Sequence, residues 1–476
     1  MRFIFVSFSQ SVFPEIVTVA DKLQSLGHET VYWIGSSEPT SFIDEKGDSG
    51  LMDNNFLLSL SNQVSLDAED VRMIADKEPH IFDFLQRTHP KKAFPELERI
   101  YHTLLLCSKW LILEKKPDVI VFRIVPNMPP LHFILYSLAR AKGIKTVIFS
   151  DTWVKGRVLA MNDFTQGTPE LKELKNEDRE IEVSDLSEDF QEYYNFQTKD
   201  LKRGVPVYMP SILNSYNLGG RAKAGFRALK KAWEIKILGK MWKTLLSHTY
   251  KWIQTHSSRE LPRAYKKLSK VADFEKPFIY FPLHLQPEFS TNPLGGYFRD
   301  QILVLELLVT HLPKNWFIYI KEHPTQWPVG GTRRGSYRPK DYYRKMARFP
   351  NVRLVPVDTD SFKLIRNSKA VATVSGTAAW ESTMRGKPSL VFGYPWFMHA
   401  PGIFVISNSS SCKDAMKKIE MGEKVDAKQV LSYLKRLDDN SFKGCLDLSY
   451  RNNPEHFTTT FEVQAEGMLK NILRLI

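Results

Sequence analysis

A run of polar residues and prolines follows the apolar segment 278–281. Pro282-Leu283-His284-Leu285-Gln286-Pro287-Glu288 comes directly after it, and Gly295 and Gly296 precede a predicted helix over residues 297–311. Glycines at a helix N-terminus allow backbone N–H groups to approach a phosphate. We therefore expect Gln286, Gly295 and Gly296 to bind a nucleotide phosphate. A loop whose glycines serve only turn geometry gives the same pattern, since neither the P-loop nor the Rossmann glycine spacing is present.

A second polar motif, Lys321-Glu322-His323-Pro324, ends the predicted strand 316–321. Lys321 and His323 can donate charge-assisted hydrogen bonds to a phosphate. Pro324 stops the strand and fixes the exit of the loop. We expect Lys321, His323 and Pro324 to belong to the same nucleotide site, although a lone histidine is more often structural.

A third motif lies where the predicted strand 370–374 enters a predicted helix over 378–385. Ser375, Gly376 and Thr377 place two hydroxyls and several N–H groups at this helix start, which suits an anion. Glu381, one turn later, can accept hydrogen bonds from a ribose. Simple N-capping and an exposed helical carboxylate are the alternatives, but three loops of this kind together predict one phosphate-and-ribose site.

The Asp358-Thr359-Asp360 motif resembles a metal-binding pattern, but it lies between a predicted strand and a predicted short helix. Asp360 in that place is expected to cap the helix. We therefore predict no metal ion and no cofactor.

Strand and helix signals alternate at both ends of the chain, which predicts parallel sheets covered by helices. The fold class is α/β, with two doubly wound Rossmann-like domains facing a central cleft and joined by a charged helical connector. We place a first Rossmann-like domain at residues 1–165, the connector at 166–275, a nucleotide-binding domain at 276–450 and a C-terminal helix within 451–476. Ligands of such sheets bind outside the carboxyl ends of the strands.

The net charge of +13 over 476 residues is concentrated in one segment. Residues 221–270 hold fourteen Lys and Arg against two Glu, a net charge of +12, whereas residues 170–192 carry −7. Apolar residues recur there every three or four positions, which predicts a basic amphipathic helix that lies on an anionic membrane. A solvated surface helix and a polyanion-binding helix are alternatives, and we do not expect nucleic acid as a partner. The expected membrane contacts are Lys230, Lys231, Trp233, Lys236, Lys240 and Trp242.

The start of the chain, residues 1–7, has the pattern of a buried strand and lacks the features of a signal peptide. No segment reaches the roughly 18–20 apolar residues that a membrane span needs. Cys107, Cys412 and Cys445 are too far apart for a zinc site and odd in number. We expect a cytoplasmic protein, placed by its basic helix on the inner face of the cytoplasmic membrane.

The three motifs resemble those of the bacterial capsule polysaccharide biosynthesis proteins, most specifically over residues 278–405. The resembling runs are residues 281–288, 321–324 and 373–381, together with Gly386-Lys387-Pro388 and Phe392-Gly393. The resemblance implies the GT-B glycosyltransferase fold, in a family that includes Kdo transferases using CMP-Kdo. It places the nucleotide phosphate on His323, Ser375 and Thr377. It also implies an inverting, metal-independent transfer to a capsular or other surface polysaccharide or glycolipid acceptor.

Such a transfer needs a general base that deprotonates the acceptor hydroxyl, worth about 10²–10⁴-fold in rate. Asp151, at the end of a predicted strand in the first domain, is the leading candidate, although it could equally be a turn residue. Glu288 and His132 are the alternatives.

Three other functions remain open. A CDP-polyol phosphotransferase of the teichoic-acid type would share the fold and a His-Pro phosphate site. A sugar-nucleotide epimerase of related fold would need paired acid and base residues in the cleft. A non-catalytic scaffold protein would bind a polyanion or a membrane through the +12 segment, and its binding to nucleic acid would weaken steeply with salt.

Overall fold

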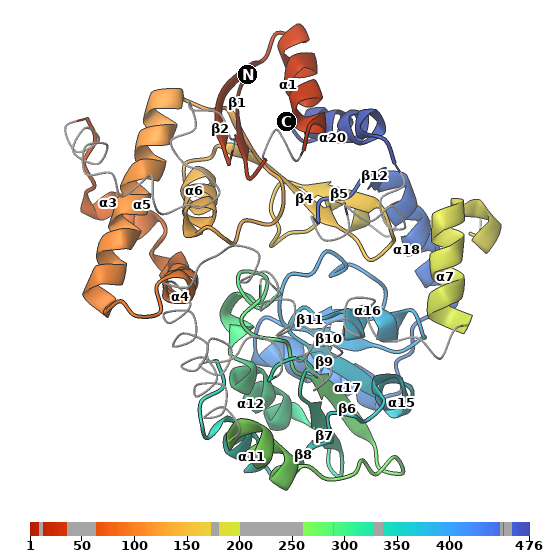
Figure 1. Cartoon of the computed structure of the whole chain (residues 1–476). Coiled ribbons are helices and arrows are strands. Elements are labelled where there is room, and N and C mark those ends of the chain that lie inside the picture. Colours follow the sequence, from red (N-terminus) through yellow and green to blue (C-terminus); the bar gives the residue numbers. More distant parts are fainter. Residues whose placement is uncertain are drawn as a thin grey trace, which may run out of the picture.

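The computed structural model describes residues 1–8, 13–35, 63–172, 180–199, 260–288, 290–327, 337–447, 451 and 459–476. Two α/β domains are seen in Figure 1, one above the other, each built on its own six-stranded sheet. The predicted fold class is confirmed. The central cleft and the predicted domain boundaries stay predictions.

The sheet of the first domain has the strand order β12-β5-β4-β3-β1-β2. Pairing is parallel from β4 to β2, whereas β5 pairs antiparallel with β4 and β12 pairs antiparallel with β5 at one edge. Because β2 lies on one side of β1 and β3 on the other, the strand order reverses between β1 and β3. The strands are β1 (Arg2–Val6), β2 (Glu29–Ile34), β3 (Val119–Phe122), β4 (Lys145–Asp151), β5 (Arg157–Met161) and β12 (Phe442–Lys443).

Successive residues of β1 point to opposite faces of this sheet, and each face has its own cover. Phe3 and Phe5 pack in one apolar cluster with α1 (Glu15–Ser25) and α20 (Phe461–Leu475). Ile4 and Val6 belong to the cluster on the other face, with α4 (Glu78–Thr88), α5 (Phe94–Lys115) and α6 (Pro130–Ala141).

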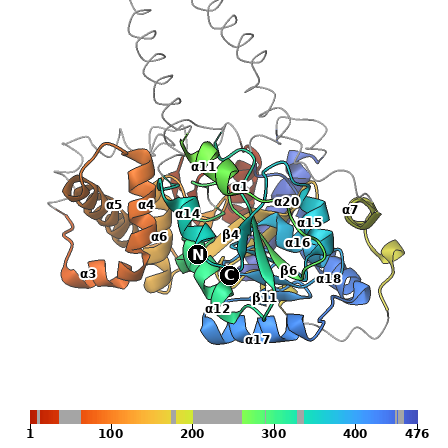
Figure 2. The same ribbon diagram turned by 90° about the horizontal axis from the view of Figure 1, so that it is seen from below.

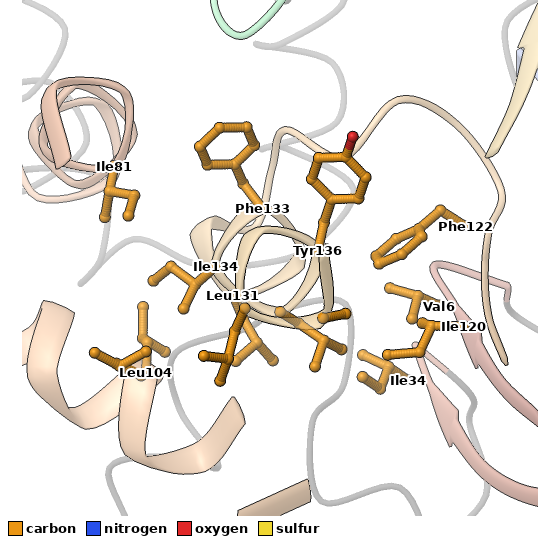
Figure 3. Packing of buried hydrophobic residues seen from close by; sticks show 14 of the residues in the cluster. Val6, Ile34, Ile81, Leu104, Ile120, Phe122, Leu131, Phe133, Ile134 and Tyr136 are labelled. Carbon is orange, nitrogen blue, oxygen red and sulfur yellow. The ribbon is translucent and has the colours of Figure 1, made fainter. Parts of the chain in front are cut away.

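Helix α6 is the centre of that second cluster (Figure 3). Val6 and Ile120 of the sheet lie on one side of it, and Ile81 of α4 and Leu104 of α5 lie on the other. The first domain therefore has an additional outer helical layer, which with α3 (Ala68–Met73) forms the orange group at the edge of the molecule in Figures 1 and 2.

The sheet of the second domain has the order β11-β10-β9-β6-β7-β8 and is parallel throughout. The chain runs from β6 outward to β8, then returns to β9 on the other side of β6. The strand order therefore reverses between β6 and β9. The strands are β6 (Phe278–Pro282), β7 (Phe317–Lys321), β8 (Val352–Leu354), β9 (Ala370–Thr373), β10 (Ser389–Val391) and β11 (Ile403–Val405).

Helices cover both faces of the second sheet, as expected for a doubly wound domain. One cluster joins the sheet to α11, α12, α14 and α17, and others join it to α15, α16 and α18. The predicted helix over 297–311 is divided at Asp300, because the Asp300 carboxylate caps α12 after a short 3₁₀ turn. The helices are α11 (Glu260–Leu268), α12 (Gln301–His311), α14 (Tyr342–Ala347), α15 (Ser361–Asn367), α16 (Thr377–Thr383), α17 (Ser409–Glu420) and α18 (Ala427–Asn440).

The end of the chain returns to the first domain. β12, although it lies within the predicted range 276–450, pairs with β5 of the first sheet, and α20 packs beside α1 (Figure 1). Arg451 forms a buried, bidentate ion pair with Glu15, from Nη1 to Oε1 at 2.8 Å and from Nη2 to Oε2 at 2.6 Å. The final segment is therefore part of the first domain's core.

Two further contacts join the domains on opposite sides of the molecule (Figure 2). On one side, His80 of α4 donates through Nδ1 to Asn292 Oδ1 at 2.6 Å, and the Asn292 amide donates to Asp83 at 2.6 Å. On the other side, α7 (Glu188–Lys199) of the connector packs on the second domain, where Trp380 Nε1 donates to Tyr193 at 2.7 Å.

Candidate functional site

The three sequence motifs meet at one edge of the second sheet. β9, β6 and β7 are adjacent strands, and each motif follows the carboxyl end of one of them. The reversal of strand order between β6 and β9 is the position at which open α/β sheets bind ligands. The structure thus brings the predicted nucleotide-binding loops together, while their role stays a prediction.

His284 links the loop after β6 to the loop after β9. Its Nε2 accepts a hydrogen bond from the Ser375 backbone N–H at 3.2 Å and lies 2.9 Å from Thr373 Oγ1. Burial, with smaller effects from His323 and Arg338, lowers the pKa of His284 to about 3, so its ring is neutral. His284 belongs to the first motif without being among the expected ligand residues, and its place directly after a strand is the sequence signal that indicates it.

Ser375 and Gly376 are held tightly by this junction. The Gly376 N–H donates to Thr373 Oγ1 at 3.1 Å, and a Cβ atom at residue 376 would lie 2.8 Å from that oxygen. The Ser375 hydroxyl donates to the backbone oxygen of Ser290. These hydrogen bonds therefore fix the conformation of the loop, and residue 376 must be a glycine because its backbone lies so close to the Thr373 side chain.

Thr377 begins α16 and is half-buried. It hydrogen-bonds to Glu381 one turn later. Burial raises the pKa of Glu381, and the nearby Arg385 and the Thr377 bond act against that rise. Glu381, which we expect to bind the ribose, is thus a half-buried carboxylate beside the loop after β9.

His323 is oriented by the residue two positions after it. Thr325 donates its backbone N–H to His323 Nδ1 at 3.3 Å, and its hydroxyl lies 2.9 Å from the same nitrogen. Because Nδ1 accepts, a neutral His323 carries its proton on Nε2. The Nε2–H is therefore the donor group of this half-buried ring, and Pro324 fixes the loop between the two residues.

Lys321 lies at the end of β7 with its ammonium already bonded inside the domain. Nζ donates to Thr359 O and to Ser361 Oγ, both at 2.6 Å. Burial lowers the pKa of Lys321 to about 8, against the opposing effect of Asp360 and Asp358. Lys321 supplies positive charge near the site and holds the loop after β8.

The first motif serves packing more than ligand contact. Gln286 uses both ends of its amide internally: it donates to Arg299 O at 3.0 Å and accepts from Gln301 at 2.8 Å. A Cβ atom on Gly295 would lie 2.4 Å from Thr291 O, and Gly296 has a φ of +50° against Tyr394. Their N–H groups donate to Thr291 O and Pro293 O, so these glycines serve close packing and a turn.

A buried ion pair that the sequence did not indicate lies behind the motifs. Arg338 Nε donates to Glu322 Oε2 at 2.9 Å, and neither side chain is exposed to solvent. Arg338 also donates to His284 O at 2.7 Å and to Gln286 Oε1. Tyr343 donates to Glu322 Oε2 at 2.6 Å. Arg338 belongs to no motif, and only the fold brings it here.

The three candidate bases lie in different surroundings. Asp151 ends β4 and accepts the Leu446 N–H at 3.0 Å, and burial raises its pKa to about 6. His132 is buried in α6, where burial lowers its pKa to about 3, followed by the effect of Arg123. Glu288 is half-buried on the loop after β6, where its backbone oxygen accepts from Thr291 and Asn292.

Asp360 caps α15, accepting the Phe362 N–H at 2.8 Å, as the sequence suggested. In the described part of the chain, no group of three or more His, Cys, Asp or Glu side chains is arranged to hold a metal ion.

The expected membrane contacts, Lys230, Lys231, Trp233, Lys236, Lys240 and Trp242, lie outside the described residues. Within the described ranges, no helix has both the length and the apolar character to cross a membrane.

Comparisons with known proteins agree with the resemblance noted in the motifs. Residues 289–421 match the family described as capsule polysaccharide biosynthesis protein, which confirms the resemblance over that part of the second domain. No curated protein matches the chain.

Solved structures also show a weak likeness. KpsC of Thermosulfurimonas dismutans, a beta Kdo 2,7 transferase, has a TM-score of 0.32 and 11% identity, over 86% of this chain and 97% of that chain. The UDP-GlcNAc 2-epimerase of Methanocaldococcus jannaschii has a TM-score of 0.26 and 11% identity, over 92% and 99%. The fold assignment rests on the strand order described above.

Proposed function

We propose that this protein is a glycosyltransferase that moves a sugar from a nucleotide-sugar donor to a capsular or other surface polysaccharide or glycolipid acceptor. The observation that carries the proposal is the junction at the β6–β9 reversal, where His284 joins two loops and His323 is oriented by Thr325. The match of residues 289–421 to capsule polysaccharide biosynthesis proteins supports it. A CMP-linked donor such as CMP-Kdo is the favoured donor, on the motif resemblance.

In the proposed reaction, the acceptor hydroxyl attacks the anomeric carbon while the bond from that carbon to the nucleotide phosphate oxygen breaks. The electron pair of the broken bond stays on the phosphate, and Nε2–H of His323 stabilises the growing charge there. Attack opposite to the leaving group gives inversion. No step calls on a metal ion.

Asp151 is proposed as the base that receives the acceptor proton. Its raised pKa of about 6 lies near neutral pH, where a general base works best. The Leu446 N–H fixes its Oδ1 at 3.0 Å, which holds the carboxylate in one orientation.

The proposed acceptor is a glycan or lipid-linked glycan at the inner face of the cytoplasmic membrane. The +12 segment over residues 221–270 supports this place, because basic segments are attracted to anionic lipids. Co-sedimentation with liposomes tests it, and equal binding to neutral and anionic liposomes would contradict it.

A binding panel tests the proposed function directly. CMP, CDP and UDP are titrated by calorimetry into the wild type and into His323→Ala. CMP-Kdo is then offered as a donor to both proteins. We expect CMP to bind and His323→Ala to weaken it. A CDP-polyol phosphotransferase also leaves CMP, because it breaks the pyrophosphate bond of its donor; CMP release from CDP-glycerol but not from CMP-Kdo would therefore favour that function. Failure of all three nucleotides to bind would contradict a nucleotide-sugar enzyme.

A further inference from the structure

Arg338 connects the two loops that carry the histidines of the site. It donates to the backbone oxygen of His284 at 2.7 Å, after β6, and pairs with Glu322, after β7. We infer that Arg338 is a positioning residue of the nucleotide site, which fixes His323 relative to His284. This inference rests on the proposed function and adds a residue that makes no contact with the nucleotide.

The link from Arg338 to His323 passes through one carboxylate. Glu322 Oε2 accepts from Arg338 Nε at 2.9 Å, and its Oε1 accepts the His323 backbone N–H at 2.7 Å. The His323 main chain is therefore held by the carboxylate that Arg338 orients. Thr325 then sets the ring, so the direction of Nε2 depends on both anchors.

The geometry requires an arginine and not merely a positive charge. The planar guanidinium reaches acceptors from both loops at once: Glu322, His284 O and Gln286 Oε1. A lysine has a single nitrogen and cannot reproduce this fork. The guanidinium carbon of Arg338 also lies 4.6 Å from the centre of the Tyr342 ring, a contact that favours a planar cation.

Other groups hold Glu322 from behind. Tyr343 donates to its Oε2 at 2.6 Å, and the Glu322 N–H donates to Tyr265 OH at 3.0 Å. With these supports, Glu322 stays buried in the cluster when Arg338 is replaced by lysine, but its carboxylate loses the guanidinium that sets its orientation toward the His323 N–H. The substitution therefore disturbs the link between the loops before it disturbs the fold.

The chain offers a matched control, the buried ion pair of Arg451 and Glu15 in the first domain. Both pairs are formed by an arginine with two bonds to a buried glutamate, but Arg451 lies on the returning C-terminal segment. Arg338→Lys and Arg451→Lys therefore change the same chemistry in two places. A purely structural role of Arg338 predicts similar effects for the two variants.

The test measures folding, CMP release from CMP-Kdo and the ¹⁵N chemical shifts of the His323 ring in the full-length protein. For Arg338→Lys we expect kcat to fall by about 10²-fold, the cost of a small misplacement. We also expect the ¹⁵N signature of the His323 ring to change, because a displaced His323 main chain weakens the Thr325 bond to Nδ1. Arg451→Lys should keep wild-type kcat and signature at a comparable loss of stability. Tyr343→Phe, a milder change at Glu322, should lower kcat in the same direction and serves if Arg338→Lys does not fold.

Wild-type kcat and an unchanged His323 signature in both Arg338→Lys and Tyr343→Phe would overturn the inference while the proposed function stands. Equal losses of kcat in Arg338→Lys and Arg451→Lys would overturn it too. The ring shifts are read without substrate, so they test the positioning role even if the nucleotide panel contradicts the proposed function.

Discussion

Replacing Asp151 by asparagine should make the protein less active and, above neutral pH, more stable. Asp151 lies at the end of β4, where burial raises its pKa to about 6 from the ordinary 3.8. The Leu446 N–H opposes this rise, Asp447 adds to it and Arg123 opposes it. Asparagine keeps an oxygen that can accept the Leu446 N–H but has no charge to bury.

The magnitude follows from the difference in pKa. A shift of about two units corresponds to at most about 3 kcal/mol between the protonation states. Since the folded-state pKa is the higher one, the folded protein binds the proton more tightly than the unfolded chain. The resulting stability is fully present below pH 3.8 and is lost as the pH rises through about 6. Asparagine does not titrate, so the gain of the variant grows over that same window.

Urea unfolding measures this effect at several values between about pH 4 and about pH 8. Asp151→Asn should approach wild-type stability in acid and exceed it by up to about 3 kcal/mol near pH 8. The exposed Asp21 provides the control, because Asp21→Asn should follow the wild-type curve. Parallel curves for Asp151→Asn and wild type would refute the burial argument.

The activity of the same variant tests the proposed base separately. Loss of the base should lower kcat for sugar transfer by about 10²–10⁴-fold. Unchanged turnover alongside the altered pH dependence would leave Asp151 as a structural carboxylate and turn the search to Glu288 and His132.

Three further outcomes are expected. His323→Ala removes the Nε2–H donor of a half-buried ring and should lower kcat by about 10²–10³-fold in a nucleotide-release assay, with unfolding little changed. Arg451→Met leaves Glu15 buried without its guanidinium and should cost about 3–5 kcal/mol in urea unfolding; a loss below 1 kcal/mol would contradict this. Gly295→Ala places a Cβ atom 2.4 Å from Thr291 O and should cost about 1–3 kcal/mol by the same measurement.

The strands of both domains were largely predictable because apolar runs bounded by glycine, proline and polar residues have a clear pattern. The segment 361–367, for example, was expected as a helix and is α15 with the expected Asp360 cap. β12 was not predictable, since two residues have no pattern of their own and their pairing with β5 depends on the whole fold. The packing of α5 on α6 was not predictable either, because the apolar periodicity of a helix shows which face is buried but not which element covers it.

The location of the candidate site was predictable from the sequence, but the hydrogen bonds among its residues were not. The motifs identified three neighbouring strand ends, yet Gln286, Gly295 and Lys321 turn out to bond and pack inside the domain. A sequence shows which side chains can bind an anion, but it does not show which of them are hydrogen-bonded to other groups of the protein. Arg338 is the opposite case, because its function depends on contacts that no spacing indicates.

The return of the C-terminal segment has a consequence for how the chain is made. Until residues 442–476 leave the ribosome, β5 lacks its outer neighbour β12, and α1 lacks α20. Glu15 likewise lacks the arginine that neutralises it. The first domain to be synthesised is therefore the last to be completed, after the second domain has emerged in full. A nascent chain stopped just before residue 442 should be far more sensitive to protease in its first domain than in its second.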